Sequence, residues 1–394
     1  MMKRYSMLWV CCFILLATTA SAQLEKQSDT TNHTSRIIPL DKAMLLKNVD
    51  VIANMQYANN SSFKNGSYTG SAFAMNQFRL EIKGYVLDTT VFFRFRYRYT
   101  RDPVVESVDN INHAVDMAFI GINLSKKVTL SFGKMCADYG GYEFDANPID
   151  IYQYNDIVNY ADNFLTGAQF TWTPNKNHQF GFQVLNARTQ TYAQIYDTIP
   201  GVKAAKFPVA FVGNWRGNFA HGLFSTFWSY TVITEASKKN VYYTALGNQL
   251  NLKKWLIQYD FKYMSDDIDR LTLVTSLIPI SYSPYPALNT SYVEHWLHIQ
   301  YAFQPKWDIS VIGMVSDAYW NGNPDPQKNS HVRTSWGIIP SLEYYPIKKL
   351  NLKFFASYLG RFYDYTSYAH SKFGLANSTT GMVMVGFISP LRIL

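Results

Sequence analysis

The sequence predicts an all-β protein, a transmembrane antiparallel up-and-down β-barrel of about sixteen strands. Three observations favour this fold. Apolar and polar side chains alternate in segments of about ten residues, which is the length that a tilted strand needs to cross a bilayer. Short and long connections alternate between those segments. The aromatic content of 16% equals the charged content of 16%, and aromatic girdles at the two bilayer surfaces explain such an excess of rings.

The alternation is clearest in residues 92–99. Side chains along a β-strand point to opposite faces in turn, so Arg94, Arg96 and Arg98 share one face while aromatic residues occupy the other. Three neighbouring arginines cannot be buried in an apolar core without partners. A closed barrel satisfies both faces, because lipid covers the rings and water inside the barrel solvates the guanidinium groups. The rest of the chain repeats this pattern, which favours a membrane barrel over a soluble all-β fold.

Sixteen candidate strands follow from about residue 48 onward. They run near 48–57, 72–85, 89–100, 113–124, 127–136, 163–173, 178–187, 207–216, 220–231, 240–250, 253–264, 292–303, 306–316, 332–345, 349–359 and 379–392. Every second connection is short and the others are generally long, as the periplasmic turns and outside loops of such barrels are. The long connections are expected over 58–71, 101–112, 137–162, 188–206, 265–291, 317–331 and 360–378. This rhythm predicts that the barrel begins and ends on its periplasmic side.

The N-terminus predicts export. Lys3 and Arg4 form a basic pair, residues 7–17 are apolar, and the small-x-small motif of residues 20–22 is typical of a cleavage site. The apolar part is too short for a membrane-spanning helix. We therefore expect a signal peptide over 1–22, a polar periplasmic lead-in over 23–46 and a barrel over 47–394.

The second and third predicted strands, 72–85 and 89–100, supply one set of candidate site residues. The pore-lining candidates are Arg79, Glu81, Lys83, Arg94, Arg96 and Arg98. If the chain turns at Leu87–Asp88, Glu81 falls opposite Arg94 and Arg79 falls opposite Arg96. Rows of basic side chains attract anions in pores, which gives these residues a role in permeation. The alternative is that the charges keep the interior wet and brace the wall through ion pairs.

Residues 137–162 supply the second set. This expected loop contains no Lys or Arg and is rich in Tyr. We expect it to fold into the barrel and narrow the lumen, so that its carboxylates face the arginine wall across a strong transverse field. The alternative is an acidic outside loop that is solvated at the surface. The candidates of this constriction loop are Asp138, Glu143, Asp145, Asp150 and Asp156.

Two neighbouring strands carry a family resemblance. The segment from Asp116-Met117-Ala118-Phe119 through Val128-Thr129-Leu130-Ser131-Phe132-Gly133-Lys134 resembles the phosphate-selective porin O/P family, in which an Asp-Ala-aromatic strand leads into a Leu-x-x-Gly-Lys strand and a long loop. The segments 166–169 and 184–186 also fit. The resemblance implies a sixteen-stranded porin, commonly trimeric, that passes anions along a basic pore. Residues 137–162 lack the basic residues that strict phosphate selectivity requires, so the expectation stops short of phosphate specificity.

Together these observations predict a porin of a Gram-negative outer membrane. It would allow passive diffusion of small hydrophilic solutes, with an anion bias that comes from Arg79, Lys83, Arg94, Arg96 and Arg98. The expected partners are outer-membrane lipid, small anionic solutes and further copies of the chain in a homotrimer. Nucleic acid is not expected as a partner, because the basic residues behind the formal net charge of +8 are spread over many strands.

No enzyme, metal or cofactor is expected. The sequence has no Gly-x-Ser-x-Gly, no Cys-x-x-Cys and no phosphate-cradling glycine loop. His295 and His298 are three residues apart, which places them on opposite faces of a strand, so they cannot share a metal by themselves. After signal-peptide cleavage Cys136 is the one cysteine left, so no internal disulfide is possible. The alternative function is a non-conducting outer-membrane barrel whose surface loops, such as 265–291 and 360–378, bind a partner.

Overall fold

A computed structural model of the chain describes residues 48–87 and 89–394. The chain divides into two units, Met1–Pro39 and Leu40–Leu394, and the fold described below belongs to the second. The expected signal peptide, the expected lead-in over 23–46 and Asp88 lie outside the described residues.

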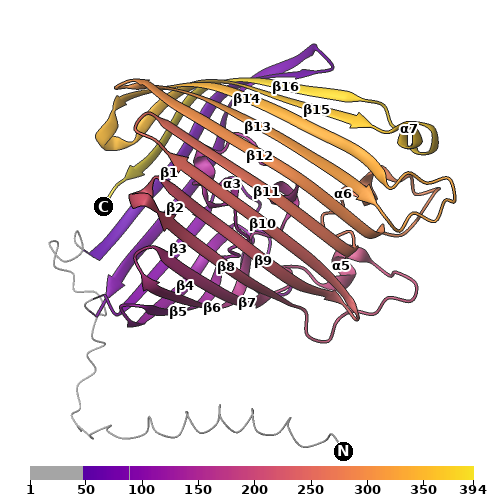
Figure 1. The fold of residues 1–394 in the computed structure, drawn as a ribbon, viewed down its shortest axis with the longest axis horizontal. Coiled ribbons are helices and arrows are strands. Elements are labelled where there is room, and N and C mark those ends of the chain that lie inside the picture. The colour runs from indigo at the N-terminus through magenta and orange to yellow at the C-terminus, as the bar shows by residue number, and fades with distance from the viewer. Residues whose placement is uncertain (1–47, 88) are drawn as a thin grey trace, which may run out of the picture. The chain divides into compact units, whose positions relative to one another are not determined.

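Sixteen strands within the described residues form one closed antiparallel barrel in sequence order, which β1 (Val49–Lys64) closes by pairing with β16 (Ser378–Arg392) (Figure 1). This confirms the predicted fold class. The other strands are β2 (Ser67–Val86), β3 (Val91–Arg98), β4 (Val115–Ser125), β5 (Val128–Cys136), β6 (Phe164–Asn175), β7 (His178–Asn186), β8 (Val209–Phe219), β9 (Phe224–Ala236), β10 (Lys239–Asn251), β11 (Trp255–Ile268), β12 (Leu288–Gln304), β13 (Trp307–Trp320), β14 (His331–Ile347) and β15 (Leu352–Tyr365).

The alternation of side chains explains why these segments are strands. On β3, Phe95 is 36% exposed on the outer face, whereas the neighbouring Arg96 is only 5% exposed on the inner face. Aromatic pairs such as Trp255 with Tyr301 stack across adjacent strands, with ring centroids 4.3 Å apart, close to the short turns. Such cross-strand ring pairs stabilise the sheet and form the girdle of a membrane barrel.

The prediction of a long loop over 58–71 is wrong, because β1 and β2 extend through these residues as one long hairpin. The two strands turn at Asn65 and Gly66, which have φ values of 48° and 79°. These are the positive φ values of a type I′ turn, which Asn-Gly favours and which matches the twist of the flanking strands. Lys64 pairs with Ser67 directly across this turn.

The predicted register of the next hairpin is also wrong. The structure pairs Arg79 with Arg98, Glu81 with Arg96 and Lys83 with Arg94, a shift of two residues from the expected pairing. The connection covers residues 87–90 and not two residues alone. Leu87 and Thr89 have φ values of 52° and 75°, and the amide of Thr90 donates a hydrogen bond to the carbonyl of Leu87, so the chain reverses over four residues and the pairing shifts by two.

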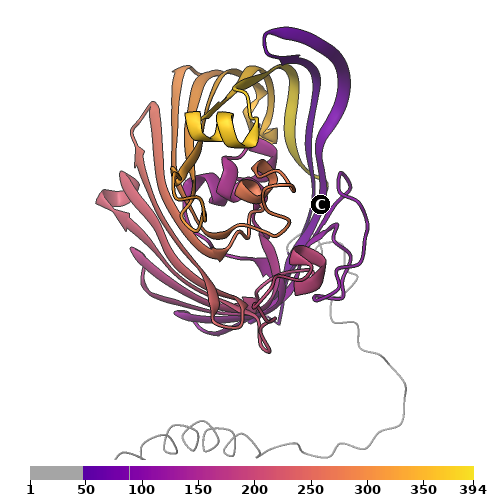
Figure 2. The same cartoon turned by 90° about the vertical axis from the view of Figure 1, so that its right-hand side faces the viewer.

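Short helices occupy several of the long connections, and Figure 2 shows helical segments inside the ring of strands. No helix of the described residues is long and apolar enough to span a membrane. The helical segments are α3 (Tyr142–Asp145), η1 (Pro148–Asp150), α4 (Asp156–Tyr160), α5 (Tyr192–Tyr196), η2 (Ala220–Gly222), α6 (Leu273–Leu277), η3 (Lys348–Leu350) and α7 (Ser367–Phe373).

One side of the barrel interior is packed with apolar side chains. Tyr139 and Ile157 from the connection after β5 join Val274 of α6, Phe373 of α7 and Trp320 of β13 in one buried cluster. The wall of this cluster runs from β5 to β14, and tight packing there excludes water. The site described next lies against the remaining part of the wall, around β1–β4.

Candidate functional site

The segment 137–163, between β5 and β6, lies inside the barrel; we call it the lumen loop. Gln56 of β1 donates a hydrogen bond to the carbonyl of Ile149 over 2.9 Å. On the far wall, the hydroxyl of Tyr152 donates to Glu343 of β14 over 3.1 Å. The lumen loop therefore reaches β1 on one side and β14 on the other.

Backbone hydrogen bonds to buried carboxylates hold the lumen loop to the far wall. The amides of Tyr142 and Glu143 both donate to Asp260 of β11 over 2.8 Å, and the amide of Ile157 donates to Glu294 of β12 over 2.7 Å. Asp260 and Glu294 are fully buried. These bonds satisfy amides at the start of α3 and α4, which would otherwise lack acceptors. The loop is thus fastened by groups that are costly to expose without their partners.

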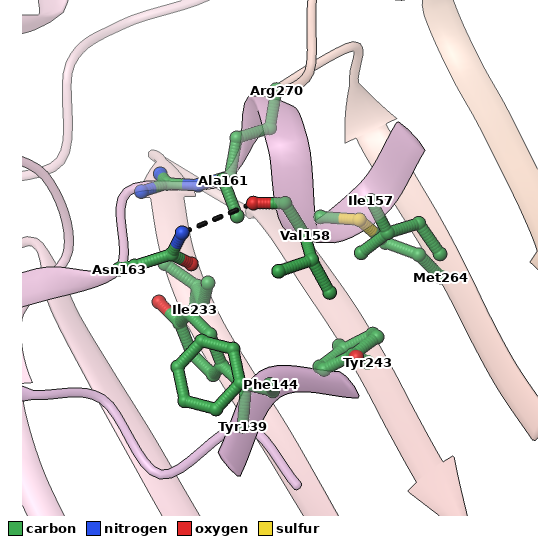
Figure 3. A pocket seen from close by; sticks show the side chains of 10 residues that line it. All are labelled: Tyr139, Phe144, Ile157, Val158, Ala161, Asn163, Ile233, Tyr243, Met264 and Arg270. Carbon is green, nitrogen blue, oxygen red and sulfur yellow. Dashed lines mark hydrogen bonds between the residues drawn. The ribbon is translucent and has the colours of Figure 1, made fainter. Parts of the chain in front are cut away.

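Apolar packing adds to this attachment (Figure 3). Tyr139, Phe144, Ile157, Val158 and Ala161 of the lumen loop face the wall residues Ile233, Tyr243 and Met264, and leave a space of only about 20 Å³ between them. The side chain of Asn163 donates to the carbonyl of Val158 over 3.0 Å and closes the end of α4. So small a space shows that the loop and the wall are closely packed.

A cavity of about 740 Å³ lies between the lumen loop and the inner faces of β1–β4. We call it the basic cavity. Eight basic and three acidic side chains line it. The wall contributes the six residues expected from β2 and β3, Arg79, Glu81, Lys83, Arg94, Arg96 and Arg98, and the loop contributes Asp138 and Asp145.

Asp116 of β4 organises the arginines, and sequence reasoning missed this role. Its buried carboxylate lies 2.8 Å from Arg98, 3.3 Å from Arg96, 3.6 Å from Arg79 and 4.0 Å from Arg101. A bulge where Arg96 and Tyr97 pair with β4 lets Asp116 face inward. In the sequence, Asp116 is an acid in the strand that follows Arg94, Arg96 and Arg98, and this position could have indicated the role.

The neighbouring carboxylates neutralise only part of the positive charge of the arginines. Four guanidinium groups share the one carboxylate of Asp116, while Arg94 pairs with Glu81 over 3.0 Å. Within the described residues, Nε and Nη1 of Arg79 and Nε of Arg96 are buried and donate no hydrogen bond. A guanidinium has five N–H donors in a planar fork that matches oxyanions. The cluster therefore carries more positive charge than Asp116 and Glu81 neutralise.

The acids of the lumen loop do not all face the arginine wall. Asp138 and Asp145 line the basic cavity but lie 3.9 Å and 2.8 Å from Arg216 of β8. Burial raises the pKa of the Asp138 carboxyl. These two acids bring negative charge to the cavity that the arginines of β2 and β3 also line.

The other three acids, Glu143, Asp150 and Asp156, point to the opposite wall, which differs from the expectation. The physical reason is that β11, β14 and β15 carry inward bases of their own. Glu143 pairs with Lys262, Asp150 with Lys353 at 3.0 Å, and Asp156 with Arg361 at 2.8 Å and with Arg333. These carboxylates attach the loop and do not form one side of a field across the basic cavity.

Among the described residues, no group of three or more His, Cys, Asp or Glu side chains is arranged to hold a metal ion. A closed sixteen-stranded barrel with a connection folded into its lumen beside a charged cavity is the architecture of an outer-membrane porin. The model of the family phosphate-selective porin O and P matches residues 49–387, and the chain belongs to this family. The match confirms the resemblance seen in β4 and β5.

Solved structures with the same fold support this class. The outer-membrane channel DcaP of Acinetobacter baumannii has a TM-score of 0.58 and 11% identity, over 86% of this chain and 96% of that one. OmpF of Salmonella typhi has a TM-score of 0.54 and 12% identity, over 86% and 97%. OmpT of Vibrio cholerae has a TM-score of 0.53 and 10% identity, over the same shares. No curated protein matches the chain. The protein is an outer-membrane channel for solute diffusion and not an enzyme.

Proposed function

We propose that this porin favours small anions and that the basic cavity is their path. The observation that carries the proposal is the sharing of Asp116 by four arginines, which leaves the wall of β2 and β3 with a surplus of positive charge. A water-filled passage with low-dielectric walls focuses such a field and raises the local concentration of anions. Cations are repelled by the same charges.

The lumen loop acts as a fixed wall of this path. The loop is attached to β11, β12 and β14, and its Asp138 and Asp145 lie beside Arg216 in the cavity that the arginines of β2 and β3 also line. Solutes then pass between a basic face and a face of mixed charge.

Single-channel recording in a planar bilayer tests this function. Purified protein inserted under a gradient of potassium chloride should give steady open channels. Their reversal potential should be shifted from zero toward the equilibrium potential of chloride. A barrel that inserts but stays closed would contradict the channel proposal and would direct attention to the outer loops as a binding surface.

We also infer that the barrel assembles as a homotrimer. Strands β3–β7 are only 8 to 12 residues long, whereas β11–β15 have 14 to 17. The short strands β3–β7 are better suited to contact with another copy of the chain than to contact with lipid. When each copy uses the same two different surfaces, such contacts close into a ring. Light scattering of the detergent-solubilised protein measures the number of chains, and a monomer would contradict the inference.

Export of the chain requires removal of the expected signal peptide over 1–22. The basic pair, the apolar stretch and the small-x-small motif support cleavage before Gln23. N-terminal sequencing of protein isolated from outer membranes should begin at this residue. A chain that still begins at Met1 would contradict cleavage.

A further inference from the structure

A second cavity, of about 260 Å³, lies between the lumen loop and the inner faces of the strands on the other side of the barrel. We call it the side chamber. Its walls are residues 146 and 150–152 of the loop together with parts of β11–β15. Ala146 and Pro390 are the only lining residues that it shares with the basic cavity. The turn of the lumen loop therefore separates two compartments.

The charged groups of the side chamber satisfy one another. Lys353 lies 2.8 Å from Glu343 and 3.0 Å from Asp150. Glu343 also accepts hydrogen bonds from the hydroxyls of Tyr152, over 3.1 Å, and Tyr345, over 2.8 Å. With one base shared between two acids, the chamber keeps an excess of negative charge that repels anions, in contrast to the arginine wall, and both acids already bind Lys353. An uncharged ligand fits it better.

Neutral hydrogen-bonding groups and aromatic rings remain. Trp296 is only 2% exposed and lines the chamber, and within the described residues nothing accepts a hydrogen bond from its indole Nε1. A buried indole N–H usually has a partner, and leaving it without one is costly. His298 and Gln258 hydrogen-bond to each other over 3.0 Å beside it, and Ser310 adds a hydroxyl.

Rings and neutral polar groups in one concave site suit a solute that has both apolar C–H faces and many hydroxyls. The C–H face of such a solute packs on an aromatic ring, and its hydroxyls bond to amide, imidazole, hydroxyl and indole groups. A monosaccharide has this chemistry, and it carries no charge that the paired ions of the chamber would need to balance.

We propose that the side chamber binds a neutral monosaccharide through Trp296, Gln258, His298 and Ser310. The porin then has two compartments of different chemistry, a basic passage and a neutral polyhydroxyl site. This site does not depend on anion preference, because none of the arginines of β2 and β3 lines it.

Saturation-transfer NMR with glucose as the probe tests the proposal. The protein is kept in an amine-oxide detergent, which has no sugar headgroup to compete. Saturation of the protein should transfer to the ring protons of glucose. The variant Trp296→Phe should raise the dissociation constant of glucose about fivefold, because one hydrogen bond is lost. The matched control is Trp172→Phe, the same change at a 43% exposed ring on the outer face, which should leave binding unchanged.

A second variant tests the same site independently of how well Trp296→Phe folds. Ser310→Ala removes one hydroxyl from the chamber wall with little change of volume and should also weaken glucose binding by a fewfold factor. The triple variant Arg94→Gln, Arg96→Gln, Arg98→Gln should bind glucose as the wild type does, whatever its ion preference. Absence of transfer in the wild type, or equal binding by the wild type and both chamber variants, would overturn the proposal.

Discussion

Arg98 holds Asp116 with two hydrogen bonds, from Nη2 to Oδ1 over 2.8 Å and from Nε to Oδ2 over 3.3 Å. This two-point contact fixes both side chains, since the planar guanidinium matches the carboxylate. Arg79 and Arg96 approach the same carboxylate from neighbouring positions. A single buried acid thus keeps several arginines close together, which their mutual repulsion would otherwise oppose.

Replacing Asp116 by Asn should raise the anion preference and lower the stability of the barrel. The change removes the negative charge that the arginines share while leaving a side chain of similar size. Loss of one partner from a buried charge cluster costs about 3–5 kcal/mol. Reversal potential reports the first effect, and urea unfolding in detergent reports the second.

Asp308→Asn is the matched control for this variant. Asp308 accepts a hydrogen bond from Gln300 over 2.8 Å on β13 and does not line the basic cavity. Its replacement should leave the anion preference unchanged. An Asp116→Asn barrel with wild-type preference would show that the shared carboxylate does not set the charge of the path.

Replacing Lys262 by Met should loosen the lumen loop. Lys262 is fully buried and pairs with Glu143, with Glu294 at 3.9 Å. Without it, buried carboxylates on the loop and wall lose their countercharge, at a cost of about 3–5 kcal/mol. We expect noisier open-channel current in single-channel records and a lower urea midpoint.

The exposed Lys254 in the short turn before β11 provides the comparison. Lys254→Met removes the same charge at the surface, where most substitutions change stability by less than about 0.5 kcal/mol. Equal effects of the two variants would mean that the ion pair with Glu143 does not attach the loop.

Acid should strengthen the anion preference through Asp138. Burial raises the pKa of this carboxyl, so Asp138 binds a proton at a higher pH than an exposed Asp does. As the pH falls from neutral, the basic cavity therefore loses one negative charge before ordinary carboxylates titrate. Reversal potentials measured over a series of pH values should show this step.

Asp138→Asn serves as the test of that assignment. The variant is neutral at every pH, so it should show a higher anion preference than the wild type at neutral pH and should lack the first step on acidification. A titration identical to that of the wild type would assign the step to another group.

The sequence predicted the barrel well, because the period of two repeats in every strand. The inner and outer faces of β3 follow from residues 92–99 alone. The two hairpin errors have local causes. The Asn65–Gly66 turn lies inside a segment that we expected to be a loop. The connection after β2 is longer than the expected two-residue turn at Leu87, which shifts the register by two residues.

The site could be predicted only in part. Arg94, Arg96 and Arg98 face inward because of their spacing, but the pairing of Asp116 with them depends on a bulge that no alternation pattern indicates. The direction of Glu143 depends on Lys262, which is more than a hundred residues away in sequence and reaches it only through the closed barrel. Such contacts follow from the register of many strands and not from any one segment.

If the arginines of β3 set the ion preference, their replacement must change the reversal potential under a salt gradient. The comparison is between the wild type, the variant Arg94→Gln, Arg96→Gln, Arg98→Gln, and a control with Lys126→Gln, Lys127→Gln, Lys176→Gln in exposed turns outside the basic cavity. Anion preference should fall toward none in the arginine variant and persist in the control. An open channel with unchanged anion preference in the arginine variant would contradict this role of the arginines.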